Sequence, residues 1–349
     1  MDDPMAAEAP DETLRAPVRH SIASKCYWQP GGQCASPDER MLDVHEPPAD
    51  VPVRGVLLYV PGGGWNGKGG KVGPSRSVLH PMVRLMLKES LFGQVFLVGG
   101  WRVLSMDHST SRIEDSEGGV ATVVHDVRAA IRFAQRHYAR PHDLPLVLVG
   151  HSSGAHIAAL AALSSNDGQF ARRYPAFLET DKQGLPLSNA VAGVVSLAGP
   201  LDLQAWISES DFEMLNRVPG VMGISDRVAD FFGCRVAGAD SLGVELPACF
   251  DEHAQTYDPI IELASPVGYL DAQDPPMYVA CASQDQWVVP SAACPAGLLK
   301  REEVAILYDV VESELPGDAV SAGLASHAMT GVDSIELSRF FNRLVAANP

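Results

Sequence analysis

One segment, residues 144–163, constrains the fold more than any other part of the chain. It reads LPLVLVGHSSGAHIAALAAL, so a short apolar run ends at G-H-S-S-G and an alanine-rich stretch follows at once. This pattern predicts a buried strand, a very tight turn and a helix, with Ser152 at the apex of the turn. Side chains at positions 150 and 154 would clash with the neighbouring strand or helix, so both positions need glycine. The serine hydroxyl would then stand clear of the sheet, near the positive end of a helix, where a nucleophile is expected.

Apolar strands and helical segments alternate along the rest of the chain. The pattern predicts an edge strand near 41–48, further strands at 53–60, 95–106, 144–150, 190–199, 276–281 and 304–311, and helices at 79–90, 118–139, from 153 onward and at 332–346. Such alternation is typical of an α/β fold, in which a mostly parallel sheet is covered by helices on both faces. Ligands bind such sheets at the carboxyl ends of the strands.

The length of 349 residues and the 46% hydrophobic content allow one large α/β domain. We expect a mobile N-terminal tail and lead-in at 1–40 and a domain at 41–349. An insertion at about 200–264 interrupts the alternation with aromatic residues mixed among acids. It is interpreted as a small cap over the strand ends that helps to shape a pocket; a helical excursion with its own small core fits its sequence equally well.

The net charge of −17 makes nucleic acid and anionic membranes poor partners, because such a surface repels phosphate groups. No apolar run reaches the roughly 18–20 residues that a membrane span needs. The N-terminus is acidic and lacks a secretory signal, so a cytoplasmic location is expected. The cysteines show no zinc-binding spacing and are expected to be free thiols, with Cys281 in the core. Pairing of Cys26 with Cys34, or of Cys234 with Cys249, would need an oxidising compartment.

A serine nucleophile needs a histidine to take its proton and a carboxylate to orient that histidine. In this fold the expected chain order is serine, acid, histidine. Asp285 directly follows the predicted strand 276–281 and is the preferred acid; Asp202, after strand 190–199, is the alternative. His327 is the last histidine and the one in the loop between the last strand and the final helix. We therefore predict Ser152, Asp285 and His327 as the catalytic residues.

The oxyanion formed in such a reaction needs fixed N–H donors. Gly62 and Gly63 follow the first strongly apolar strand, and Ser153 follows the nucleophile, so these three residues are the predicted oxyanion hole. The glycine-rich stretch at 67–71 matches neither the phosphate-loop nor the dinucleotide fingerprint. No cofactor and no metal are called for.

Taken together, these residues resemble the α/β-hydrolase superfamily, in its esterase/lipase branch with an H-G-G-x-W oxyanion loop and a G-H-S-A-G-[GA]-H elbow. That branch includes kynurenine formamidase-like, isoprenylcysteine methylesterase-like and small carboxylesterase proteins. Here the loop reads Pro61-Gly62-Gly63-Gly64-Trp65 and the elbow reads GHSSGAH at 150–156. Pro61 replaces the usual histidine of the loop. The resemblance implies the α/β-hydrolase fold and covers residues 40–347.

The leading hypothesis is a serine carboxylesterase that acts on a small-molecule ester through an acyl-enzyme on Ser152. An aryl-formamidase-type amide hydrolase would use the same residues. A third alternative is a ligand-binding homologue that has kept the fold without turnover, because fold alone does not determine function.

Overall fold

The computed structural model describes residues 22–26, 41–65, 96–97, 99–108, 119–165, 168–173, 187–217, 223–239, 247–282, 285, 287–296, 298, 308–311 and 334–347. The predicted helix at 79–90 and the predicted base His327 lie outside these ranges. Strand β1 falls within the segment 1–40, for which the sequence predicts a tail and lead-in; the division at residue 40 stays a prediction.

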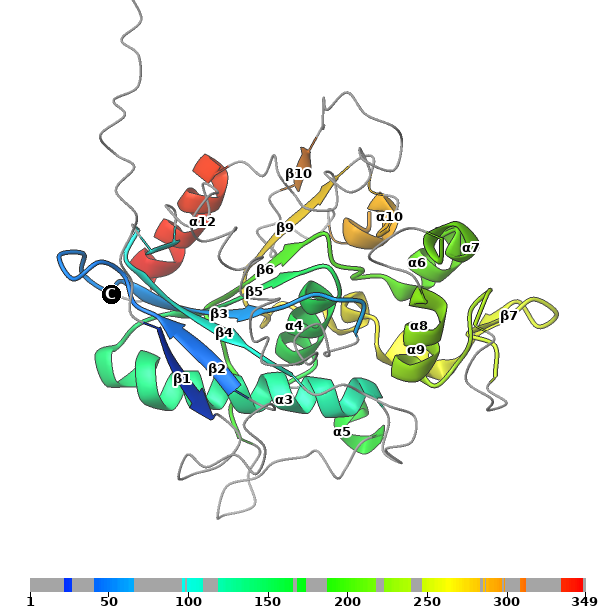
Figure 1. The fold of residues 1–349 in the computed structure, drawn as a ribbon, viewed down its shortest axis with the longest axis horizontal. Helices are drawn as coiled ribbons and strands as arrows, with labels where there is room; N and C mark the ends of the chain where they lie inside the picture. Colours follow the sequence, from blue (N-terminus) through cyan, green and yellow to red (C-terminus); the bar gives the residue numbers. More distant parts are fainter. Residues whose placement is uncertain are drawn as a thin grey trace, which may run out of the picture.

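One large sheet forms the centre of the described structure (Figure 1). Its eight strands lie in the order β1 (Ile22–Cys26), β2 (Met41–His45), β4 (Trp101–Met106), β3 (Gly55–Val60), β5 (Leu146–His151), β6 (Gly193–Leu197), β9 (Met277–Ala282) and β10 (Tyr308–Val311). All neighbours from β4 to β10 pair in parallel, whereas β2 pairs antiparallel with both β1 and β4. The predicted mostly parallel sheet is therefore confirmed. The predicted strand near 41–48 is present but is not an edge strand, because β1 pairs with its outer side.

Both faces of the sheet are buried, as the continuous apolar strands predict. In β3, Val56, Leu58 and Val60 pack into one hydrophobic cluster and Leu57 and Tyr59 into another on the opposite face. This split follows from the alternation of side chains along a strand.

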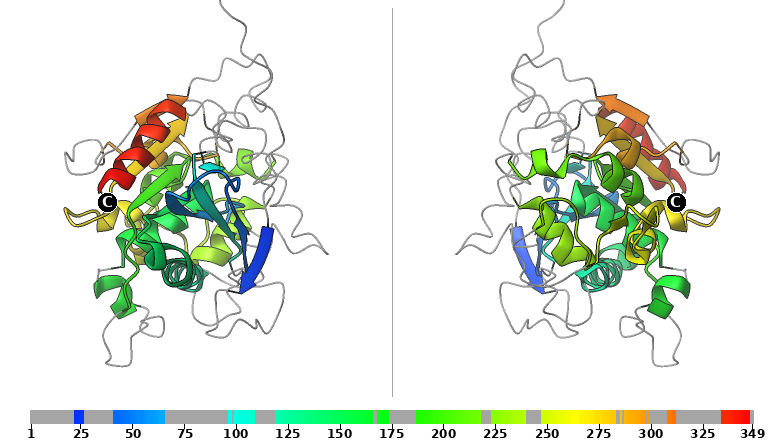
Figure 2. Two further views of the ribbon diagram at one scale, coloured as in Figure 1. Left: turned by 90° about the vertical axis from the view of Figure 1, so that its left-hand side faces the viewer. Right: turned by 90° about the vertical axis from the view of Figure 1, so that its right-hand side faces the viewer.

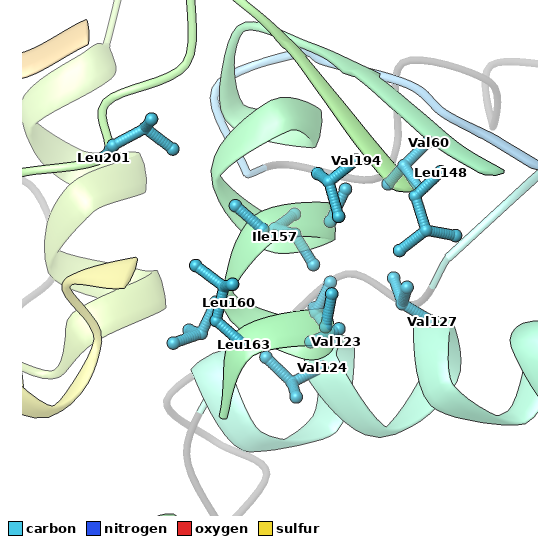
Figure 3. Close-up of a cluster of buried hydrophobic side chains, with 14 of the residues drawn as sticks. Val60, Val123, Val124, Val127, Leu148, Ile157, Leu160, Leu163, Val194 and Leu201 are labelled. Atoms are coloured by element: carbon cyan, nitrogen blue, oxygen red, sulfur yellow. The ribbon is translucent and has the colours of Figure 1, made fainter. Parts of the chain in front are cut away.

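Helices cover the two faces separately. Helix α3 (Gly119–Ala134) and helix α4 (Ser153–Leu163) supply the first cluster, where side chains from β3, β5 and β6 point toward both helices (Figure 3). Helix α12 (Ser334–Ala347) covers the other face with Leu337, Phe340, Phe341 and Leu344 (Figure 2). A π-helical turn at Gln135–Ala139 and a 3₁₀ turn at Arg140–His142 extend α3 toward β5.

The insertion is mainly helical in its described parts. It lies beside the sheet, near helix α10, which follows it in the chain (Figure 1). The remaining elements are α5 (Gly168–Arg173), α6 (Leu203–Glu209), α7 (Phe212–Leu215), α8 (Ile224–Phe232), the pair β7 (Phe250–Asp251) and β8 (Thr256–Tyr257), α9 (Pro259–Leu263), a 3₁₀ turn at Pro266–Tyr269 and α10 (Pro290–Ala293). Buried residues of α6, α7 and α8 belong to the same cluster as α3 and α4, so these helices extend the main core. None of the described helices is both long and apolar enough to cross a membrane.

Strand β4 is shorter than predicted. The sequence predicts a strand over 95–106, but the strand begins at Trp101. The residue before it, Gly100, has a φ of 83° and lies where a Cβ would be 2.4 Å from the carbonyl oxygen of Pro52. A left-handed turn at Gly100 therefore ends the extended conformation on that side.

The expectation of free thiols is wrong for four cysteines. Cys234 is bonded to Cys249 within the insertion, and Cys281 in β9 is bonded to Cys294 at the end of α10. The second pair had no signal in the sequence, because the spacing of Cys281 and Cys294 does not show that the end of α10 packs against β9. Cys281 is nevertheless a buried core residue, as predicted.

Replacing both Cys234 and Cys249 by serine should lower the free energy of unfolding by about 3 kcal/mol, because the bond closes a loop of about 15 residues in the unfolded chain. Urea denaturation of the variant and the wild type under non-reducing conditions measures the difference. Alkylation without prior reduction, read by mass spectrometry, serves as the control and should leave both wild-type cysteines unlabelled. Equal unfolding midpoints would contradict the prediction.

Candidate active site

Ser152 lies at the junction of β5 and α4, with backbone angles of φ 56° and ψ −132°. A serine rarely adopts this conformation, so the surrounding structure must hold it there. The Ser152 N–H donates to the carbonyl of Leu197 in β6 at 2.8 Å, and its own carbonyl accepts the N–H groups of Ala155 and His156. The sharp turn predicted from the G-x-S-x-G pattern is therefore present.

Two glycines make this turn possible by close packing. A Cβ on Gly150 would lie 2.5 Å from the Cα of Ala155, and one on Gly154 would lie 2.3 Å from the carbonyl oxygen of Val60. Real Cβ atoms do not approach backbone this closely, so both positions require glycine, as predicted. The second contact also brings the end of β3 against the start of α4.

The predicted oxyanion loop lies against the elbow. A Cβ on Gly62 would lie 2.6 Å from the carbonyl oxygen of His151 and 3.0 Å from the Cβ of Ser152. Gly63 has a φ of 136° and Gly64 a φ of 63°, conformations that favour glycine. The structure therefore brings Gly62 next to Ser152. The roles of Gly62, Gly63 and Ser153 as donors stay a prediction.

Helix α4 begins at Ser153, immediately after the predicted nucleophile Ser152. Its first N–H groups have no partner within the helix, and the helix dipole places partial positive charge at this end. An oxyanion formed on a substrate bound at Ser152 would lie in this field, so the arrangement suits acyl transfer.

Asp285 is a buried carboxylate in the turn after β9. One of its oxygens, Oδ1, accepts the N–H groups of Trp287 at 2.8 Å and Val288 at 3.0 Å. These bonds fix the side chain at the carboxyl edge of the sheet. Its partner in the predicted triad, His327, is outside the described residues.

The alternative acid, Asp202, has a different environment. Its Oδ1 accepts the N–H groups of Gln204 and Ala205, so the side chain caps the N-terminus of α6. This is an ordinary helix cap, which accounts for the residue without a catalytic role.

A cluster of buried aromatic rings connects the oxyanion loop, α4 and the insertion. The ring of Trp65 packs against Trp206 in α6 and against Phe231 and Phe232 in α8, with centroid distances of 5.0, 5.5 and 5.4 Å. Trp206 also donates its indole N–H to the carbonyl of Trp287 in the turn that holds Asp285. Sequence reasoning did not find this framework, although Trp65 belongs to the loop motif, because the partners of Trp65 lie in a distant insertion.

His156 completes the cluster. The indole Nε1 of Trp65 donates to His156 Nδ1 at 3.0 Å, and His156 Nε2 lies 2.8 Å from the carbonyl oxygen of Ala264. Burial lowers the pKa of His156 to about 4, and the hydrogen bond to Ala264 opposes that shift. The side chain is therefore neutral at physiological pH. Among the described residues, no group of three or more His, Cys, Asp or Glu side chains could hold a metal ion.

The low pKa of His156 predicts a pH-dependent stability. In the unfolded chain the imidazole has a pKa of about 6.5, so the unfolded state binds the proton first. Stability should therefore fall by roughly 3 kcal/mol as the pH drops from about 6.5 to about 4, in addition to the effect of the carboxylates. Urea denaturation across this range should show a clearly smaller fall for His156→Gln, which cannot titrate. Parallel curves for the two proteins would contradict the assigned cause.

The contact of Gly62 with the elbow predicts a selective loss of activity in Gly62→Ala. The added methyl group must push the loop away from Ser152, so kcat for the ester hydrolysis that the sequence predicts should fall roughly 100-fold. Gly268→Ala is the matched control, because a Cβ there would meet nothing closer than 3.8 Å. Steady-state kinetics on a chromogenic ester and far-UV circular dichroism compare the two variants. If Gly62→Ala and Gly268→Ala are both folded and have equal kcat values, the close contact of Gly62 with Ser152 is not needed for activity.

Comparison with known proteins shows which family the chain resembles. The BD-FAE family model matches residues 42–295, which is most of the chain. Esterase LipQ of Mycobacterium tuberculosis is 28% identical over 76% of the chain and 49% of its own length. Esterase LipC of the same organism is 25% identical over 98% of the chain and 72% of its own length. The chain thus spans about half the length of LipQ.

Among solved structures, an inhibited esterase B from Lactobacillus rhamnosis superposes with a TM-score of 0.57 at 14% identity, over 95% of this chain and 88% of that one. At this identity the likeness concerns the fold, which is the α/β-hydrolase fold that the sequence resemblance implies.

Proposed function

Because the chain belongs to the BD-FAE family of α/β-hydrolase esterases, we propose that it hydrolyses carboxylic esters of small molecules through an acyl-enzyme on Ser152. The observation that carries the proposal is the conformation of Ser152. Its strained backbone, the start of α4 and the close approach of Gly62 together present a hydroxyl beside candidate oxyanion donors.

In the proposed reaction, Ser152 attacks the acyl carbon while His327 takes its proton. Asp285 orients the imidazole and stabilises its cation. The N–H groups of Gly62, Gly63 and Ser153 hold the oxyanion. The tetrahedral intermediate then collapses as His327 protonates the leaving alcohol, and water releases the acid by the same route. The names of the two esterase relatives support an ester as the substrate, and that this ester is a small molecule is part of the proposal.

A labelled fluorophosphonate and a panel of p-nitrophenyl esters of increasing acyl length test this proposal. Wild-type protein should be labelled and should release nitrophenol, whereas Ser152→Ala and His327→Ala should lose at least about 1,000-fold in kcat/KM. An aryl formamide in the same panel distinguishes amide from ester preference. A folded wild-type protein that neither reacts with the probe nor turns over any ester would favour the non-catalytic, ligand-binding alternative.

The choice of acid has a matched pair of variants. Asp285→Asn should lower kcat by roughly 1,000-fold or more, because an amide cannot stabilise the imidazolium. Asp202→Asn should stay within about threefold of wild type, since asparagine also caps helices well. The same ester assay measures both, and the reverse ranking would assign the role to Asp202.

The cytoplasmic location stays a prediction, and the two disulfides weigh against it, because disulfides persist mainly in oxidising compartments. Free thiols can be counted in protein that is trapped in acid from fractionated cells. Disulfide-bonded protein would indicate an oxidising compartment, and fully reduced protein would indicate the cytoplasm.

A further inference from the structure

The oxyanion loop has one polar anchor inside the protein. Trp65 follows the three glycines at 62–64 and is 3% exposed, and its indole N–H ends on a nitrogen of His156. His156 lies one helical turn after Ser152, and its backbone N–H donates to the Ser152 carbonyl at 3.3 Å. His156 therefore contacts both the predicted oxyanion loop, through Trp65, and Ser152, the predicted nucleophile.

The two hydrogen bonds of His156 determine its tautomer. An indole N–H can only donate, so Nδ1 must carry no proton. The carbonyl of Ala264 can only accept, so Nε2 must carry the proton. Both ring nitrogens are thereby satisfied in a site that is closed to solvent, and the imidazole has a single orientation.

The Ala264 carbonyl ties the same imidazole to the insertion, because Ala264 is the C-terminal cap of α9. The packing partners of Trp65 in α6 and α8 come from the insertion as well. The indole is thus held by packing against three rings, one of them stacked, and by the hydrogen bond of its N–H to His156.

A run of three glycines needs such an anchor. Gly62, Gly63 and Gly64 have no side chains to pack, and two of them have positive φ. The orientation of their N–H groups therefore depends on where the chain is fixed at each end. Pro61 fixes one end beside Gly154, and Trp65 fixes the other.

We propose that His156 is a positioning residue for the oxyanion hole, holding the N–H groups of Gly62 and Gly63 at Ser152 through its hydrogen bond with Trp65. This role rests on the proposed esterase function. It would act on kcat rather than on KM, because a displaced oxyanion donor weakens the transition state more than the bound substrate.

Two substitutions separate the two hydrogen bonds. In His156→Asn, the amide Oδ1 occupies the position of Nδ1 and can still accept from Trp65. In His156→Gln, the amide nitrogen reaches toward the position of Nε2 and can still donate to Ala264, but the Trp65 bond is lost. Trp65→Phe removes the same bond from the other side and keeps an aromatic ring in the cluster.

We expect kcat for a p-nitrophenyl ester to fall about 10- to 100-fold in His156→Gln and in Trp65→Phe, with KM within about threefold of wild type. His156→Asn should keep kcat within about threefold of wild type. The double variant Trp65→Phe/His156→Gln should be no slower than either single variant, because both break one bond. A role in packing alone would give the opposite ranking, since glutamine is closer to histidine in volume.

Ser164→Ala is the control for a general disturbance of α4. Ser164 caps the far end of the same helix, where its hydroxyl accepts from Arg128. Its loss should lower the unfolding temperature but leave kcat unchanged within about twofold. If it lowers kcat as much as His156→Gln does, the effect at His156 is one of stability, and the proposal is wrong.

A measurement that needs no turnover tests the positioning role of His156 independently of the proposed esterase activity. In two-dimensional ¹H–¹⁵N spectra of the full chain, His156→Gln should shift the backbone amide signals of Gly62 and Gly63, and His156→Asn should shift them much less. If the wild type has no esterase activity but His156→Gln still shifts these signals, the proposed function is wrong and the positioning role of His156 stands. Unmoved glycine signals, or kcat unchanged in His156→Gln and Trp65→Phe, would overturn the role of His156.

Discussion

The close approach of backbone to backbone around Ser152 is the constraint on which the rest of the site depends. The end of β3, the oxyanion loop and the start of α4 meet at distances that leave no room for side chains at positions 62, 150 and 154. This approach places the start of α4 and the loop that carries the predicted oxyanion donors next to Ser152. Because β3 and β5 are parallel neighbours in the sheet, the contact is built into the strand order.

A second layer of interactions holds this geometry from outside. Backbone contacts fix the elbow, but a glycine loop is held only as firmly as its ends, and one end depends on Trp65. The insertion supplies three of the rings around Trp65 and the carbonyl that orients His156. Through the aromatic cluster, the position of the glycine loop therefore depends on the insertion. The same cluster reaches the turn that holds Asp285, through the hydrogen bond from Trp206 to Trp287. In this arrangement the insertion contributes to the framework of the site.

The parts of the fold that could be predicted from the sequence are those fixed by local patterning. Strands β3, β5, β6 and β9 are continuous apolar runs, and helices α3, α4 and α12 have helical spacing or composition, so their existence and type follow from residues close in the chain. The start of β4 was misplaced because a buried glycine turn looks like a continuing strand. The disulfide between Cys281 and Cys294 was missed because spacing does not show which strand and helix come together.

By itself, the sequence determined the elbow, the strand and helix pattern and the family resemblance, because each depends on residues that are neighbours along the chain. Only the tertiary structure decided that Asp202 caps a helix while Asp285 is buried at the sheet edge, since both acids follow a predicted strand. It also decided that His156 receives the indole N–H of Trp65 and donates to Ala264. These contacts join segments separated by 91 and 108 residues, and such pairings are set by how helices and loops pack on the sheet.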